Sequence, residues 1–169
     1  PDLSIYSEGG SPAVSEETVE KVKEHPAVKK CYGRLYSDSV TLRQQDKTRK
    51  IHLISYESLQ FQWARKSLVE GSLRDSEEGQ GVLIDYPTSQ YLATGEEITL
   101  ETAQGSVSVP VTGVLSDTPF NTSTGVVICS EELFSEITGI QDYAVLDIQL
   151  NRRVSEQDID ELRDLAGTS

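Results

Sequence analysis

The stretch VSEETVEKVKE, residues 14–24, decides the fold, because it returns near the end of the chain as VSEQDIDELRD, residues 154–164. The two stretches align without gaps and agree in residue class at nearly every position. Such a match within one chain indicates an internal repeat. A second interpretation stays open, since general capping rules make unrelated amphipathic helices look alike. We expect a duplicated helix with one copy toward each end of the chain.

Each stretch carries the signals of a helix start. Ser15 and Ser155 are placed as N-caps, where a serine side chain accepts hydrogen bonds from free backbone N–H groups. Acidic residues follow in both first turns, where the helix dipole favours them. Hydrophobic staples are expected to join Val14 with Val19 and Val154 with Ile159. The apolar stripes are Val19 and Val22 in the first helix, and Ile159, Leu162 and Leu165 in the second.

A strand is expected before each helix. Apolar residues alternate at Ala144, Leu146, Ile148 and Leu150 ahead of the second helix, and at Leu3 and Ile5 ahead of the first. Pro26 ends the first helix, because a proline disfavours helical geometry at the residue before it, His25. Two strand-helix units commonly share one sheet with both helices on a single face. The ends of the chain therefore predict one α+β layer.

The middle of the chain has the pattern of short strands. The predicted strands are Tyr32–Leu42, Lys50–Ser55, Val82–Asp85, Ile98–Thr102, Val107–Leu115 and Val126–Cys129. Pro110 predicts an edge strand or a bulge, because proline cannot donate to a sheet ladder. Two helices are predicted, at Ser58–Val69 with Trp63 as a core anchor, and at Glu131–Thr138 between the cap Ser130 and the stop Gly139.

These elements predict two lobes. Residues 1–78 and 140–169 form the lobe of strand-helix units, and residues 79–139 form a small β-rich lobe inserted between them. The entry hinge is expected at residues 75–81 and the exit hinge at residues 138–142, where polar residues and glycines gather.

Composition restricts the function. The chain has 169 residues with 28 acidic and 15 basic side chains, a net charge of −13, which argues against nucleic-acid binding and against adhesion to anionic lipid. This charge could attract cationic peptides or could serve solubility alone. The longest apolar runs have four residues, too few to span a bilayer. The chain begins at Pro1 and contains no methionine, which indicates a piece of a longer protein.

No motif for catalysis, metal binding or a cofactor is present. His25 and His52 lie in no nucleophile or metal motif, and no glycine-rich phosphate loop occurs. Cys31 and Cys129 are expected to be buried, and whether they pair stays open. Asn121-Thr122-Ser123 is interpreted as a polar loop. We predict that the chain is not an enzyme; the alternative, a hydrolase, requires a concave cluster of His25 or His52 with a perturbed carboxylate.

Four segments in the middle of the chain carry a family resemblance. They are Leu68–Ser72, Gly81–Asp85, Gly95–Leu100 and Val111–Leu115. In order and spacing they resemble the extracytoplasmic domain, the MacB-like periplasmic core, of FtsX/MacB-type ABC transporter permeases. Two departures are Ser72, where the family has arginine after glycine, and residues 86–95, where relatives carry an alanine-rich helical turn.

The resemblance implies a fold and a setting. The fold would be a porter-like lobe of two strand-helix units, N- and C-terminal, with the β-rich lobe inserted. The domain would lie on the extracytoplasmic side of the cell membrane and couple ATPase-driven motion to export, release or sensing of a substrate. Its partners would be the transmembrane helices of the permease, a cytoplasmic ABC ATPase subunit and a second permease copy. No substrate-binding residue is implied, and the alternative is a free-standing extracellular binding module or adhesin.

Overall fold

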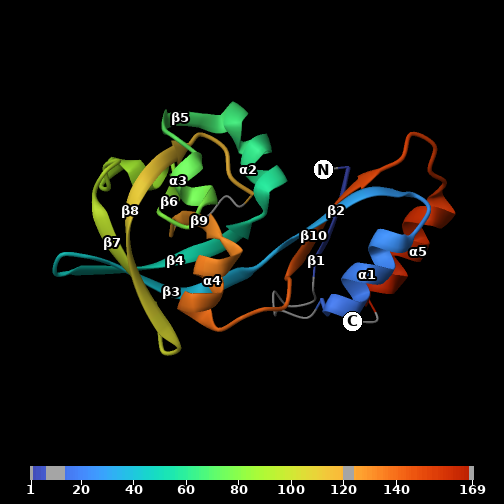
Figure 1. The fold of residues 1–169 in the computed structure, drawn as a ribbon, viewed down its shortest axis with the longest axis horizontal. Helices are drawn as coiled ribbons and strands as arrows, with labels where there is room; N and C mark the ends of the chain where they lie inside the picture. The colour runs from blue at the N-terminus through green and yellow to red at the C-terminus, as the bar shows by residue number, and fades with distance from the viewer. Residues whose placement is uncertain (1, 7–13, 120–123, 168–169) are drawn as a thin grey trace. The chain divides into compact units, whose positions relative to one another are not determined.

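The computed structural model describes residues 2–6, 14–119 and 124–167, and the chain divides into two compact units (Figure 1). The smaller unit contains residues 1–36 and 141–169, and the larger unit contains residues 37–140. Asn121-Thr122-Ser123, interpreted above as a polar loop, lies outside the described residues. None of the described helices has the length and apolar character needed to cross a membrane.

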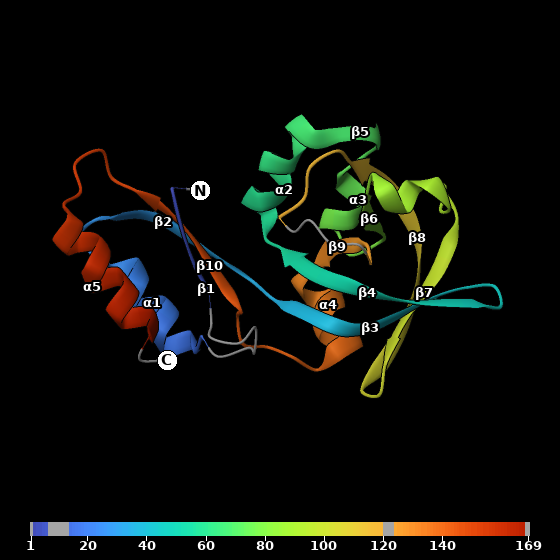
Figure 2. The ribbon, with the colours of Figure 1, turned by 180° about the vertical axis from the view of Figure 1, so that it is seen from behind.

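The smaller unit is a three-stranded antiparallel sheet in the order β1-β10-β2 with two helices on one face (Figures 1 and 2). Its elements are β1 (Leu3–Tyr6), α1 (Glu16–Glu24), β2 (Val28–Arg34), β10 (Val145–Leu150) and α5 (Glu156–Gly167). The central strand β10 comes from the end of the chain and pairs with two strands from its beginning. The prediction that both strand-helix units share one layer is confirmed.

The predicted caps begin both helices. The Ser15 side chain accepts from the backbone N–H of Thr18 at 3.2 Å, and α1 ends at Glu24, with His25 in extended conformation before Pro26. The Ser155 side chain accepts from the backbone N–H of Asp158 at 3.1 Å. Each cap satisfies a backbone donor that the first turn of a helix leaves without a partner.

One apolar cluster holds the smaller unit together. Its buried members are Ile5, Val14, Val19, Val22, Cys31, Leu146, Ile148 and Leu162. Leu146 lies opposite Ile5 in the sheet, and Ile148 lies opposite Cys31. The predicted stripe of α1 is fully inside this cluster, whereas Ile159 in α5 is only half-buried. Burial of apolar surface between sheet and helices is therefore the main stabilising term of this unit.

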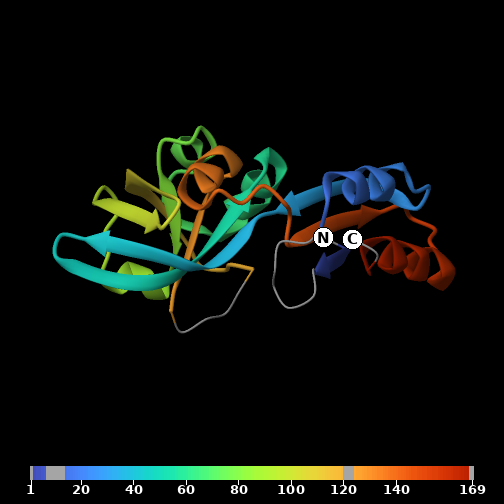
Figure 3. The same cartoon turned by 90° about the horizontal axis from the view of Figure 1, so that it is seen from below.

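The larger unit is a seven-stranded sheet that closes on itself. The strand order is β5-β8-β6-β9-β4-β3-β7, and β7 pairs in turn with β8. The strands are β3 (Tyr36–Gln44), β4 (Lys47–Tyr56), β5 (Leu68–Gly71), β6 (Val82–Asp85), β7 (Glu97–Thr102), β8 (Gly105–Leu115) and β9 (Val126–Ser130). β3 and β4 form a long hairpin (Figure 3). The helices are α2 (Ser58–Ala64), η2 (Arg65–Ser67), α3 (Arg74–Glu77), η3 (Pro87–Gln90) and α4 (Glu131–Thr138).

Pro110 lies where β8 changes partners. Residues 105–110 pair with β7, and from Val111 onward β8 pairs with β6 on one side and β5 on the other. The register of β6 against β8 shifts directly after the pair of Val82 and Val111. A proline is tolerated at such a point because it lacks the N–H that a regular ladder needs.

Helix α4 has the predicted boundaries. The Ser130 side chain accepts from the backbone N–H of Leu133 at 3.3 Å, and Gly139 ends the helix in the left-handed conformation, with φ of 73°. Leu133, Phe134 and Ile137 are buried against the sheet. Any Cβ at Gly105 would lie 2.2 Å from the carbonyl oxygen of Glu136, so glycine is required for this close approach.

The division of the chain differs from the expectation at one boundary. The first boundary lies between Tyr36 and Ser37 rather than after residue 78, because β3 and β4 pair with β7 and β9 of the larger unit. The expected entry hinge at residues 75–81 is instead part of the larger unit, where Ser76 is buried and bonds Thr112. The second boundary, between residues 140 and 141, falls inside the expected exit segment.

Two expectations for the helix after residue 58 were wrong. α2 ends at Ala64, and Leu68 instead belongs to β5, opposite Leu115 in the sheet. Trp63 is 38% exposed, whereas Phe61 is buried and its ring packs edge-on against Tyr56 at 5.6 Å. Phe61 and Ala64 define the buried face of this helix, and Trp63 falls outside it.

Replacing Leu146 with alanine is expected to destabilise the chain by about 2–5 kcal/mol, because it leaves a cavity under both helices. Val69→Ala, at an apolar side chain that is 55% exposed, is the matched control and should cost less than about 1 kcal/mol. Urea unfolding followed by far-ultraviolet circular dichroism measures both. Equal effects of the two substitutions would contradict the assigned core.

Candidate functional site

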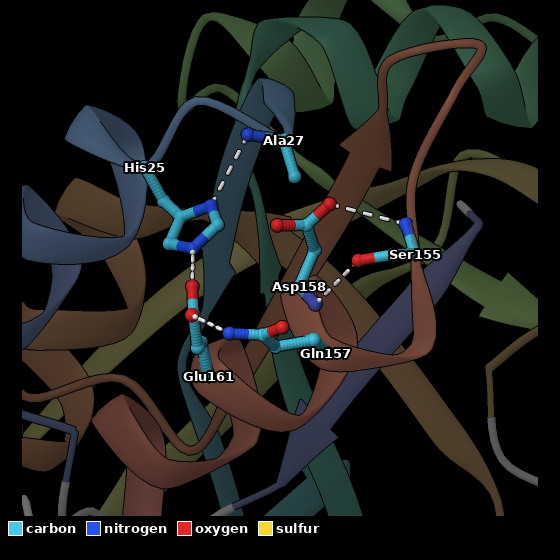
Figure 4. Close-up of polar contacts among 6 residues, drawn as sticks. All are labelled: His25, Ala27, Ser155, Gln157, Asp158 and Glu161. Carbon is cyan, nitrogen blue, oxygen red and sulfur yellow. Dashed lines mark hydrogen bonds and ion pairs between the residues drawn. The ribbon is translucent and has the colours of Figure 1, made fainter.

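The first cluster of chemically competent side chains lies where α1 ends and α5 begins (Figure 4). His25, Asp158 and Glu161 bring their nitrogen and oxygen atoms within 4.8 Å of one another. His25 Nε2 lies 2.8 Å from Glu161 Oε2. The imidazole is largely buried, and the Glu161 carboxylate is half exposed. The hydrolase alternative requires a concave cluster of His25 or His52 with a perturbed carboxylate, and this cluster contains His25.

The protonation of His25 follows from its second contact. The backbone N–H of Ala27 donates to His25 Nδ1 at 3.1 Å (Figure 4). Nδ1 is therefore an acceptor without a hydrogen, and the ring proton lies on Nε2, where it donates to Glu161. Both nitrogens are occupied, so the imidazole has no lone pair left to act as a general base.

Asp158 completes a capping box at the start of α5. Its carboxylate accepts from the backbone N–H of Ser155 at 3.1 Å, while the Ser155 hydroxyl oxygen accepts from the Asp158 N–H. The Ser155 backbone hydrogen bond lowers the pKa of Asp158, with a further contribution from the Ser155 hydroxyl. This perturbed carboxylate is explained by helix capping, and the Ser155 hydroxyl is used in the cap.

The cluster does not fit a metal site. A metal ion on Nε2 would need the lone pair of that nitrogen and would move the ring proton to Nδ1. Nδ1 would then carry a hydrogen that faces the N–H of Ala27, 3.1 Å away. The donor set therefore matches a network that joins two helix ends. His52, the other histidine, lies in β4 of the larger unit, opposite Val126.

The pH dependence of stability should report on Asp158. Because its pKa is lower in the folded chain, its stabilising effect is fully present above the pKa of the unfolded chain and is lost as pH falls through the folded value. Asp158→Asn should therefore be less stable than the parent near neutral pH, and the difference should shrink below about pH 4. Chemical denaturation at a series of pH values measures this difference.

Asp164→Asn, at an exposed position later in the same helix, is the control. It removes the same charge without touching the capping box, and it should not weaken the chain at neutral pH, since acidic groups are unfavourable near a helix C-terminus. A parent and an Asp158→Asn variant with parallel pH profiles would contradict the capping role.

A second polar cluster crosses the three strands of the smaller unit. Arg34 Nε lies 2.8 Å from Asp147 Oδ2, Arg34 Nη2 donates to Oδ1 at 3.0 Å, and the Ser4 hydroxyl donates to the same Oδ1 at 2.8 Å. Arg34 and Asp147 are 5% and 4% exposed. Removing either partner would leave an uncompensated buried charge, so the pair must be kept intact.

Asp147 lies between Leu146 and Ile148 in β10, and its burial was not predicted from the sequence. The signal was an acidic residue inside a strand otherwise expected to be covered, which calls for a cationic partner. The partner could not be chosen from sequence, because Arg34 lies 113 residues earlier in the chain.

Both cysteines are buried thiols, as expected. Cys31 lies in the core of the smaller unit and Cys129 in β9 of the larger unit. Burial raises the pKa of the Cys129 thiol far above its ordinary value, which suppresses the reactive thiolate.

The fold is that of extracytoplasmic domains of ABC-type transporters. It resembles the extracellular domain of the noncanonic ABC-type transporter YknZ from Gram-positive bacteria, with a TM-score of 0.64 and 19% identity over 94% of this chain and 86% of that chain. It also resembles the periplasmic region of MacB from Actinobacillus actinomycetemcomitans, with a TM-score of 0.67 and 14% identity over 96% of this chain and 80% of that chain. No protein-family model and no curated protein matches the chain.

These likenesses confirm the α+β fold that the sequence predicted. At identities of 19% and 14% they establish a shared fold, and they assign no role to any individual residue.

Proposed function

We propose that this chain is the extracytoplasmic domain of an ABC transporter permease. In this role it couples motion driven by a cytoplasmic ATPase to the export, release or sensing of a substrate outside the membrane. The observation that carries the proposal is the fold, which this chain shares over most of its length with two domains that are parts of such transporters.

The topology of the smaller unit supports this proposal. The first and last described elements, β1 and α5, contact each other in that unit, and the larger unit is inserted between them. A domain placed between two membrane-spanning segments has to receive and return the chain on the same side. The arrangement of these elements suits that requirement.

The chemistry of the described residues also suits a mechanical role. Both imidazole nitrogens of His25 are used in hydrogen bonds that join the helix ends, and the buried Arg34–Asp147 pair connects two neighbouring strands. We therefore propose a domain that moves as a body and is not an enzyme. Its partners would be the spanning helices of the permease, an ABC ATPase subunit and a second permease copy. Motion would pass between these partners by rearrangement at their interfaces.

The proposal is tested by isolating the full-length gene product from detergent-solubilised membranes through an affinity tag. An ABC-type ATPase subunit is expected to co-purify in a defined stoichiometry. The control is a tagged membrane protein of another class from the same cells. A full-length product that brings no ATPase subunit, or that leaves the membrane on alkaline washing, would refute the proposal and favour the free-standing binding module.

A further inference from the structure

The larger unit contains an open groove between α4 and β8, with a volume of about 390 Å³. One wall is residues 107–110 of β8, and the other includes Glu132, Leu133 and Glu136 of α4. Residues 78–80, directly before β6, and Ser130 line the rest. This volume lies within the range of clefts that hold ligands.

The β8 wall of the groove is an unpaired strand edge. Val111 exchanges hydrogen bonds with the segment before β7: its N–H donates to Glu96 O at 2.8 Å, and its carbonyl accepts from Gly95 N at 2.7 Å. Successive residues of a strand direct their backbone N–H and C=O groups to opposite edges. The groups of Ser106 and Ser108 therefore point to the edge of β8 that faces away from β7. In the described part of the chain β6 is the neighbour on that side, and its pairing begins only at Val111.

The charge of the groove is acidic throughout. Three glutamates line it, Glu78, Glu132 and Glu136, and the lining includes no lysine, arginine or histidine. Glu78 lies 3.3 Å from the Arg74 guanidinium, whereas Glu132 and Glu136 form no ion pair within the described residues. The first turn of α4 favours Glu132 through the helix dipole.

Glu136 has no such explanation. It lies one turn after Glu132 on the same side of the helix, where two like charges repel each other. A cation bound between them would relieve this repulsion. Together, a free strand edge and two unpaired carboxylates beside it are complementary to one kind of partner: a peptide backbone that carries positive charges.

We propose that this groove binds an extended peptide segment rich in lysine or arginine. The segment adds to the edge of β8 at Ser106 and Ser108, with backbone hydrogen bonds, and places basic side chains against Glu132 and Glu136. This inference gives the domain a partner class and rests on the function proposed above only for its setting outside the membrane.

The test is titration of the 169-residue chain, at low ionic strength, with a fluorescent eight-residue peptide of alternating lysine and valine. Binding should weaken about fivefold in the double variant Glu132→Gln and Glu136→Gln, because two partly exposed charge pairs are lost. The matched control is Glu20→Gln with Glu24→Gln, two exposed glutamates at the same spacing on α1. This control should change the affinity less than twofold.

A second peptide tests the backbone contacts. The same sequence with N-methyl groups on every backbone amide keeps its charge but has no N–H to donate to a strand ladder on either edge, and it should not bind. In the nuclear magnetic resonance spectrum of the nitrogen-15-labelled chain, addition of the parent peptide should shift the amide signals of Ser106 and Ser108.

Three results would overturn the inference: no binding of the parent peptide, equal weakening in both double variants, or unimpaired binding of the methylated peptide. The titration does not involve the ATPase subunit. Failure of the groove and failure of the transporter assignment are therefore seen in separate experiments.

Discussion

The smaller unit depends on its central strand, β10, which pairs with both β1 and β2. This pairing joins residues from the end of the chain to both strands from its beginning, and it places Leu146 and Ile148 under α1 and α5. Without β10 the first two strands would have no partner between them, and the helices would lose the centre of their common core. The apolar face of the sheet and the capped helices therefore form as one cooperative layer.

This constraint explains why the chain can carry a large insertion. The backbone leaves the smaller unit after Tyr36 and returns at Gln141, and the residues between these points form a closed sheet with their own core. Such an insertion requires only that its first and last residues connect to β2 and β10 without disturbing the pairing of these two strands. Pairing between residues so distant in sequence makes the closure of the smaller unit a late and entropically costly step of folding.

The same arrangement gives the proposed function a physical basis. Two units with separate cores can each move as a body, because close packing inside each core resists deformation. Two polar contacts connect elements of the smaller unit: the Arg34–Asp147 pair joins β2 to β10, and the His25–Glu161 contact joins the end of α1 to α5. The groove proposed to bind a peptide lies beside α4, and all the residues that line it belong to the larger unit.

Local chemistry made much of this fold predictable from sequence. One capping serine, Ser130, and the glycine Gly139 predicted both ends of α4 correctly, and the repeated cap and apolar stripe predicted the layer of α1 and α5. The first unit boundary could not be found, because the strand predicted at Tyr32–Leu42 runs across it, and only Leu35 separates β2 from β3.

Contacts between distant residues were equally out of reach. Glu161 lies 136 residues after His25, and no local pattern indicates that the two meet. Trp63 was misassigned because large aromatic side chains are usually anchors, whereas the helix it lies on buries Phe61 instead. The free edge of β8 depends on where β6 begins to pair, which is a tertiary property.

The location of this domain in intact cells tests the proposed extracytoplasmic role most directly. Ala103, in the exposed turn between β7 and β8, is replaced by cysteine in the full-length protein, which is then treated with a membrane-impermeant maleimide. The parent is the control, since Cys31 and Cys129 are buried. An extracytoplasmic domain of a membrane protein predicts labelling of the Ala103→Cys protein in intact cells, in a band that stays in the membrane after alkaline washing. Labelling that requires permeabilised cells would contradict the proposed role.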